Sequence, residues 1–221
     1  MDIQERLTAF AMLGATWVMW LLVLLSIVGL AIILERAYYL FASRDDVAKL
    51  KADLLSRLRA NDVEGARKRM QTSRSVEAQV VLAGLEAADD GAHSAEQRMQ
   101  GQQSLARMNM ERNLAFLGTV GNNAPFVGLA GTVIGIIRAF HELNETQGQV
   151  SAGLMAEVGE ALVATLIGLL VALPAVAFFN FFSRVIKTRM MRADALGKEV
   201  LAYLQSKRRG TPDDAADAAA E

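Results

Sequence analysis

Glu160, Thr132 and Thr165 are the residues whose types and positions could support chemistry, because each lies in or beside a long uncharged stretch. A carboxylate next to hydrocarbon costs roughly 2.5–3.5 kcal/mol at a helix centre and less near an end. A buried Glu160 would handle protons or form an ion pair, whereas at the water interface it would complement the first turn of a helix. A threonine hydroxyl can donate and accept hydrogen bonds where water is absent, although threonine is also common in contacts between membrane helices.

The composition excludes several other kinds of chemistry. The 221 residues include no cysteine, which excludes thiolate metal sites and a cysteine nucleophile. His93 and His141 are far apart without metal-ligand spacing, and no phosphate-binding glycine motif of the Walker type occurs. The 23 Lys and Arg nearly balance the 24 Asp and Glu, so there is no basic surplus for nucleic acid. We therefore expect no metal, no cofactor, no nucleic-acid partner and no enzymatic activity.

Three uncharged stretches must position these residues. They cover residues 7–34, 113–137 and 161–183, and each can span a bilayer, for which about 20 apolar residues in a helix suffice. The sequence therefore predicts an all-α membrane protein with three transmembrane helices in a lipid bilayer. Glu160 and Thr165 are about 140° apart around such a helix, so they cannot share one narrow stripe.

The distribution of Lys and Arg predicts the orientation of the spans. These residues follow the first span, precede the second and follow the third, but none occurs between Arg138 and Arg184. The pattern is that of a bacterial inner-membrane protein whose N-terminus faces outward. The predicted organisation is a periplasmic N-terminus (1–13), a first span (14–35), a cytoplasmic helical region (36–113), a second span (114–140), a short periplasmic loop (141–157), a third span (158–183), a cytoplasmic C-terminal helix (184–209) and a disordered tail (210–221).

The cytoplasmic segment 36–112 contains no proline, and its apolar residues recur at three- and four-residue steps. This pattern predicts helices. We expect the second span and the cytoplasmic segment before it to form one long helix. We likewise expect the helix of the third span to continue into the cytoplasm beyond its C-terminal end. The first span carries bulky apolar residues on all sides, so we expect it to face lipid.

Small residues predict close helix contacts in the second and third spans. The positions concerned are Gly128, Gly131 and Gly135 in the second span, and Ala161, Ala164, Gly168, Ala172 and Ala175 in the third. Because small residues lie around both helices, we expect each helix to make more than one contact, and hence an oligomer. Pro125 and Pro174 are expected to mark kinks or protein-lined backbone, since the carbonyls that they free need partners.

Two motifs in these spans resemble the ExbB/TolQ family, whose relatives include the flagellar stator protein MotA. Thr132 in the first motif and Glu160 in the second are 28 residues apart, as in that family. Gly159 stands where an alanine often precedes the glutamate. The resembling residues are Ala124-Pro125 to Gly128-Leu129, Gly131-Thr132-Val133 and Gly135, followed by Glu160-Ala161-Leu162, Ala164-Thr165, Gly168, Pro174 and Asn180.

The resemblance implies a homo-pentamer of three-span subunits whose second and third helices surround a central pore. Two single-span partner helices of the ExbD/TolR type would lie in that pore, each with an aspartate that takes up and releases protons. Thr132 and Thr165 would then line the proton path, with Glu160 near its outer end. A TonB- or TolA-like protein would be a further partner.

The main hypothesis is a proton-channel subunit, or stator, of an inner-membrane motor that converts the proton motive force into mechanical work on the cell envelope. The alternative is a non-conducting membrane scaffold that assembles single-span partners. A secondary transporter is disfavoured, because three spans without internal repeats offer no midplane site. The sequence does not choose between TonB-dependent uptake, a Tol–Pal system and gliding-type motility. Two threonines without a further carboxylate inside the spans favour protons over sodium ions.

Overall fold

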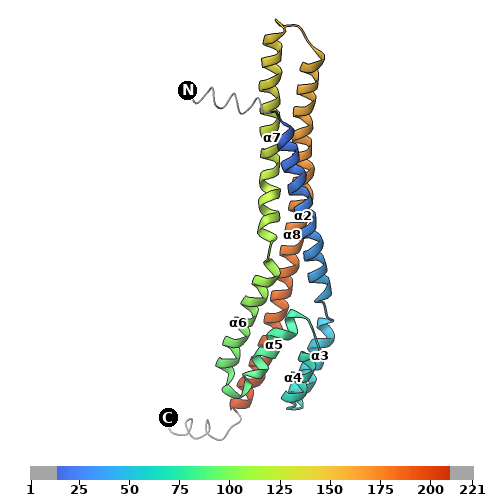
Figure 1. Ribbon diagram of the computed structural model, residues 1–221. Helices are drawn as coiled ribbons and strands as arrows, with labels where there is room; N and C mark the ends of the chain where they lie inside the picture. Colours follow the sequence, from blue (N-terminus) through green and yellow to red (C-terminus); the bar gives the residue numbers. More distant parts are fainter. Residues whose placement is uncertain (1–13, 210–221) are drawn as a thin grey trace, which may run out of the picture. The chain divides into compact units, whose positions relative to one another are not determined.

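The computed structural model describes residues 14–209, and within this range all regular elements are helices (Figure 1). The N-terminal segment 1–13 and the tail 210–221, predicted to be periplasmic and disordered respectively, lie outside the described residues. The described chain divides into two compact units. Unit 1 comprises residues 14–35 and 113–182, and unit 2 comprises residues 36–112 and 183–209.

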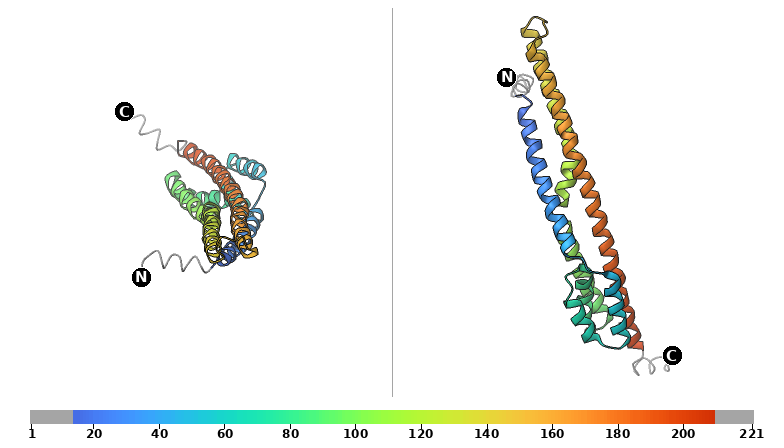
Figure 2. Two further views of the ribbon diagram at one scale, coloured as in Figure 1. Left: turned by 90° about the horizontal axis from the view of Figure 1, so that it is seen from above. Right: turned by 90° about the vertical axis from the view of Figure 1, so that its right-hand side faces the viewer.

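Unit 1 is formed by parts of three long helices, α2 (Thr16–Ala42), α7 (Leu114–Glu145) and α8 (Ala152–Arg209). Each is long and apolar enough to cross a membrane, which confirms the three predicted spans. Helices α7 and α8 form an antiparallel pair, and α2 lies beside them in unit 1 (Figures 1 and 2). Only residues 146–151 connect α7 to α8, so the connection is shorter than the predicted loop 141–157.

A tight turn joins α7 to α8. Gln147 and Gly148 both adopt positive φ angles of 53° and 84°, and the Gly148 N–H donates to the Leu143 carbonyl at 2.9 Å. The Ser151 hydroxyl then accepts from the Leu154 N–H at 3.0 Å and caps the start of α8. We call the end of unit 1 that carries this turn the loop end.

The first span, which was predicted to face lipid, also has a buried face. Ala15, Val18 and Leu22 are almost completely buried in the core of unit 1, together with residues of α7 and α8. The opposite face of α2 is exposed and carries Trp20 and Leu24 among other large apolar residues. Bulky side chains on all sides of the helix hid this asymmetry in the sequence.

Unit 2 contains four short helices and a 3-10 turn, together with residues 36–42 of α2 and residues 183–209 of α8. The elements wholly within it are α3 (Val47–Arg59), α4 (Val63–Gln71), α5 (Val76–Glu86), η1 (Ala88–Asp90) and α6 (Ala92–Glu111). Three of the helices begin at side chains that accept backbone N–H groups, which explains why they start where they do. These capping residues are Asp46, Asp62 and Ser75.

The core of unit 2 is built from large aliphatic side chains. Leu50, Leu54 and Leu58 of α3 recur on one face and are buried, as the three- and four-residue spacing predicts. Met70 of α4 and Leu196 of α8 belong to the same cluster. The cluster therefore holds the short helices against α8.

A buried ion pair also lies in unit 2. The Arg189 side chain of α8 is 6% exposed and the Glu77 side chain of α5 is 1% exposed, with 3.4 Å between Nε and Oε1. The Arg189 guanidinium also donates to the Ser43 hydroxyl at 2.8 Å and to the Ser43 and Leu40 carbonyls at the end of α2. One cation thus joins three helices of unit 2.

The second span does not continue as one long helix, so this prediction was wrong. Helix α6 ends at Glu111 and α7 begins at Leu114, because Arg112 is extended and Asn113 is left-handed with φ 62°. Asn is one of the few residues that adopt this conformation readily. Arg36 Nη1 donates to the Asn109 carbonyl at 2.8 Å and so satisfies one of the last carbonyls of α6. The third-span prediction was confirmed, because α8 runs without interruption for 58 residues.

Candidate functional site

The second and third spans touch through glycine and alanine. A Cβ atom at Gly128 would lie 2.8 Å from the Ala164 carbonyl oxygen, and one at Gly135 would lie 2.5 Å from the Ala161 Cβ. A Cβ at Gly131 would lie 2.7 Å from the Ala164 Cβ. The glycines predicted to allow close approach therefore do so within one chain, where they bring the backbones of α7 and α8 together. Gly168 contributes from α8, facing the Ala124 carbonyl and Gly128.

Thr165 lies at this close contact. Its hydroxyl donates to the Gly128 carbonyl at 3.0 Å, from α8 to α7. Thr132 lies one turn beyond Gly128 on α7, and its hydroxyl donates to the Leu129 carbonyl of its own helix at 2.6 Å. Both side chains are half-buried. The structure thus brings Thr165 to α7, one helical turn from Thr132.

Glu160 is directed toward a different helix. The Thr16 hydroxyl, at the start of α2, donates to Glu160 Oε1 at 2.8 Å. Glu160 therefore faces α2 while Thr165 faces α7, in agreement with their five-residue spacing on α8. The three residues predicted for the proton path do not form one cluster in the single chain.

Further charged residues surround the loop end. Arg138 Nη2 of α7 pairs with Glu157 Oε1 of α8 at 2.7 Å, so its charge is matched by a carboxylate of the same chain. Glu142 Oε1 accepts from the Ser151 hydroxyl at 2.5 Å. These contacts tie α7 to the first turns of α8, next to Glu160.

Both prolines lie inside continuous helices. Pro125 is within α7 and is half-buried, whereas Pro174 is within α8 and is exposed in the single chain. Pro125 directly follows Ala124, whose carbonyl oxygen is in close contact with Gly168. One of the two prolines therefore lies beside the α7–α8 contact.

Sequence reasoning missed Thr16 as a partner of Glu160, because the two residues are 144 positions apart. It also missed polar side chains on the exposed surface of α7. Asn123 donates to the Thr119 carbonyl at 2.8 Å, and the Thr119 hydroxyl donates to the Ala115 carbonyl at 3.0 Å. The presence of Thr119 and Asn123 within the second uncharged stretch was a signal available in the sequence. Polar side chains of a membrane helix usually face protein or water.

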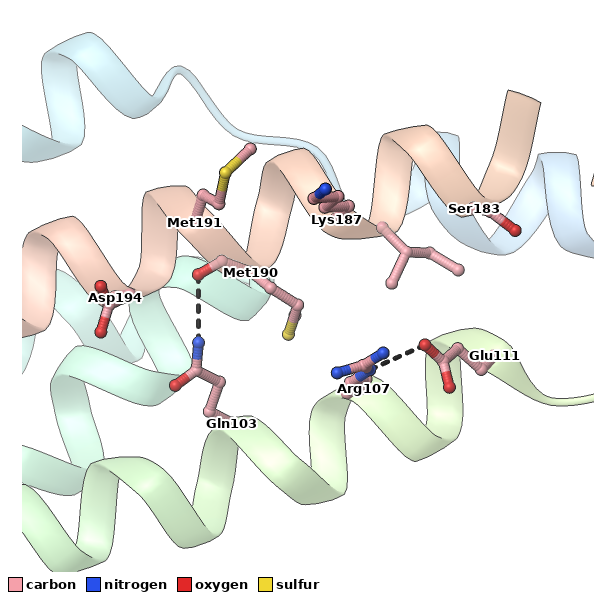
Figure 3. A pocket seen from close by; sticks show the side chains of 9 residues that line it. Gln103, Arg107, Glu111, Ser183, Lys187, Met190, Met191 and Asp194 are labelled. Atoms are coloured by element: carbon pink, nitrogen blue, oxygen red, sulfur yellow. Dashed lines mark hydrogen bonds and ion pairs between the residues drawn. The ribbon is translucent and has the colours of Figure 1, made fainter. Parts of the chain in front are cut away.

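Unit 2 has a separate groove of about 640 Å³ between α6 and α8 (Figure 3). Its polar groups are largely satisfied within the chain: Gln103 donates to the Met190 carbonyl at 3.1 Å, and Arg107 pairs with Glu111 at 2.8 Å (Figure 3). None of the predicted site residues lines it. Among residues 14–209, no group of three or more His, Asp or Glu side chains is arranged to hold a metal ion.

Comparison with known proteins identifies the chain's relatives. A family model described as the MotA/TolQ/ExbB proton channel family matches residues 72–195, which is more than half of the chain. The chain belongs to this family. The resemblance inferred from the two motifs is thereby confirmed. The part of the chain that matches the MotA/TolQ/ExbB family includes Thr132, Glu160 and Thr165.

Individual relatives match over shorter stretches. Biopolymer transport protein ExbB of Xanthomonas campestris pv. campestris is 42% identical over 91 residues, covering 41% of this chain and 36% of the relative. Tol-Pal system protein TolQ of Pseudomonas aeruginosa is 47% identical over 74 residues, covering 34% and 32%. ExbB of Salmonella typhimurium is 41% identical over 98 residues, covering 44% and 40%. The matches thus span about a third to two fifths of the length of these relatives.

Proposed function

We propose that this protein is the proton-channel subunit of an inner-membrane motor that uses the proton motive force to do mechanical work on the bacterial cell envelope. In this proposal five copies surround a pair of ExbD/TolR-like helices, and a TonB- or TolA-like protein transmits the work outward. The N-terminus faces the periplasm, and unit 2 lies in the cytoplasm. The chain itself is not an enzyme and carries no cofactor.

One observation carries the proposal. In a chain of the MotA/TolQ/ExbB proton channel family, the Thr165 hydroxyl lies at the contact of the second and third spans, one turn from Thr132. Each of the two hydroxyls can both donate and accept, so each can hydrogen-bond a proton-carrying group of a partner helix where bulk water is absent. A proton crossing the membrane yields about 2.3 kcal/mol per 100 mV, which is enough to move packed helices between discrete arrangements.

Removing the hydroxyls tests the proposal. The chain is reconstituted in liposomes with the single-span partner that co-purifies with it, and proton flux is followed with an internal pH dye. Thr132→Val and Thr165→Val should each reduce flux about tenfold or more, equivalent to about 1.4 kcal/mol on the barrier. Thr188→Val is the matched control, because the Thr188 hydroxyl bonds the Arg184 carbonyl of its own helix, in unit 2. Unchanged flux in both span variants would refute the assigned role.

The scaffold alternative has its own support, since a threonine that bonds a carbonyl across a glycine contact also serves helix packing. Glu160→Gln separates the two functions. The substitution keeps the size of the side chain and its ability to accept from Thr16, but it cannot titrate. A proton channel should lose most of its flux, whereas a scaffold should assemble and function as the unmodified chain does.

A further inference from the structure

An apolar stripe on α6 is exposed in the described part of unit 2. Leu105 and Met108 are 55% and 64% exposed, whereas Ala106 and Met110 of the same helix are buried. Beyond the end of α2, the large apolar side chains exposed in the described part of unit 2 are these two and Met191 of α8. Apolar side chains that gather on an exposed surface commonly mark a contact with another protein.

Two arginines flank this stripe. Arg98 and Arg112 lie seven residues before and after Leu105, which places all three on one face at about 3.6 residues per turn. Both arginines are exposed, and neither side chain forms a hydrogen bond or ion pair among residues 14–209. We call Arg98, Leu105, Met108 and Arg112 the α6 ridge. The ridge has an apolar middle and a cation at each end, about 21 Å apart along the helix.

The groove between α6 and α8 lies on the opposite side of α6. Its α6 wall includes Gln103 and Arg107, each two residues from Leu105 and hence about 160° away around the helix. Its α8 wall includes Met190 and Met191. Helix α6 therefore presents the ridge on one side and a wall of the groove on the other.

The groove is acidic at both ends. Figure 3 shows Asp194 at one end and Glu111 at the other. Glu96 of α6 lines a smaller pocket that Asp194 also lines. Asp194 and Glu111 have cationic partners in their own chain but stay 48% and 47% exposed, so a further cation can approach them. Glu96 and Glu111 are 15 residues apart, about 22 Å along α6, which nearly equals the spacing of the two ridge arginines.

Ridge and groove match in register when two copies of the chain stand side by side in one membrane and face the same way. Such copies are related by rotation about the membrane normal, so residues at equal depth meet. Arg112 of one copy is then level with Glu111 of the next, since the two are adjacent in sequence. Arg98 is likewise level with Glu96, two residues away. A contact between two different surfaces leaves each copy free to bind two neighbours, and it closes into a ring.

We propose that the α6 ridge of one copy of this chain docks into the α6–α8 groove of the next copy, so that unit 2 forms a subunit contact of the ring. This proposal rests on the proposed function for a ring of copies that face the same way. An apolar centre with charged groups at the rim is the usual anatomy of a protein interface. Lys187 lines the groove between its acidic ends, where its aliphatic stem can pack against Leu105.

Disulfide cross-linking tests the contact, because the chain has no cysteine of its own. The full chain carrying Leu105→Cys and Met191→Cys is purified without a single-span partner and oxidised. It should give a ladder of covalent oligomers that ends at the closed ring, since the two positions lie on opposite sides of α6. Leu105→Cys with Ala52→Cys is the matched control, because Ala52 is exposed on α3 and lines neither surface. Equal ladders from both pairs would refute the proposed contact.

Leu105→Asp provides a second measurement, which requires no cross-link. In detergent, the protein concentration at which the assembly half-dissociates should rise about tenfold, as expected when one central interface residue is lost. Ala52→Asp should leave that concentration unchanged. Native mass spectrometry counts the copies, and circular dichroism checks that both variants keep their helices. An assembly with Leu105→Asp that matches the unmodified one would contradict the proposal.

The remaining outcomes separate this inference from the proposed function. If the chain alone gives no ladder and an added single-span partner protects Met191→Cys from a water-soluble maleimide, the groove belongs to that partner and the proposal is overturned. If the ladder forms but no assembly carries proton flux, the proposed function fails and the contact stands. If flux is present while neither Leu105→Asp nor the cysteine pair has an effect, only this inference fails.

Discussion

Units 1 and 2 differ in the side chains that bring their helices together. In unit 1 the closest approaches are made by glycine and alanine, as at Gly128 and Ala164. In unit 2 the buried core contains many leucine side chains together with Met70, and a buried pair of Arg189 and Glu77 lies beside it. In water, large apolar side chains stabilise a core by leaving solvent, but in lipid this gain is absent and close van der Waals contact takes its place. The difference indicates that the two units are adapted to different solvents.

The largest effect is expected from Arg189→Met in unit 2. The substitution leaves the Glu77 carboxylate buried without its cation, which should cost about 3–5 kcal/mol of unfolding free energy. Thermal unfolding of unmodified and variant chains in lipid nanodiscs measures the change. Lys198→Met is the control, because its ion pair with Asp194 is exposed. Combining Arg189→Met with Glu77→Leu should recover most of the loss, and equal effects of Arg189→Met and Lys198→Met would contradict the role of burial.

An intermediate effect is expected from Gly128→Ala in unit 1. The added methyl group would lie 2.8 Å from the Ala164 carbonyl oxygen and 3.0 Å from the Thr165 Cα, both backbone atoms that cannot rotate away. We expect a loss of about 1–3 kcal/mol, as for other overpacked cores. Gly159→Ala is the matched control, since a Cβ there meets no atom within 4 Å. If both variants unfold alike, unit 1 does not depend on close backbone contact.

The smallest effect on the unfolding free energy is expected from Ser73→Ala in unit 2. The Ser73 hydroxyl donates to Asp45 Oδ2 at 2.5 Å and holds the pKa of that carboxyl below its ordinary value of 3.8. The backbone N–H of Asp46 and the charges of Arg69 and Lys49 act in the same direction, while partial burial opposes them.

Because the folded pKa is the lower one, this stabilisation is complete above about pH 3.8 and disappears as the pH falls through the folded value. The unfolding free energy of unmodified chain and Ser73→Ala should differ by less than about 1 kcal/mol at neutral pH. The difference should shrink below pH 3.8 in an acid titration of stability. A difference that grows with acidity would contradict the sign of the pKa shift.

The spans could be predicted because uncharged length is a property of the sequence alone. The small residues at Gly128, Gly131 and Gly135 likewise identified where α7 meets another helix, since only small side chains permit backbone contact. The sequence did not say whether that helix belongs to the same chain. In the structure, each of these three glycines contacts α8 of the same chain.

The remaining features depend on residues that meet only after folding. The hydrogen bond from Thr16 to Glu160 joins positions 144 residues apart, and no local pattern identifies such a pair. The break between α6 and α7 was missed because the left-handed residue is Asn113 and neither glycine nor proline marks the position. Its stabilising partner, Arg36, lies on α2 far from it in sequence.

The glycine contact between α7 and α8 has a consequence for handling the protein outside its membrane. At Gly128 and Gly168 the two backbones leave no room for an acyl chain to enter between them. Attraction between touching atoms does not require that lipid surround them. The hairpin should therefore survive extraction into detergent micelles as one piece, and fragments cut within residues 146–151 should reassociate there.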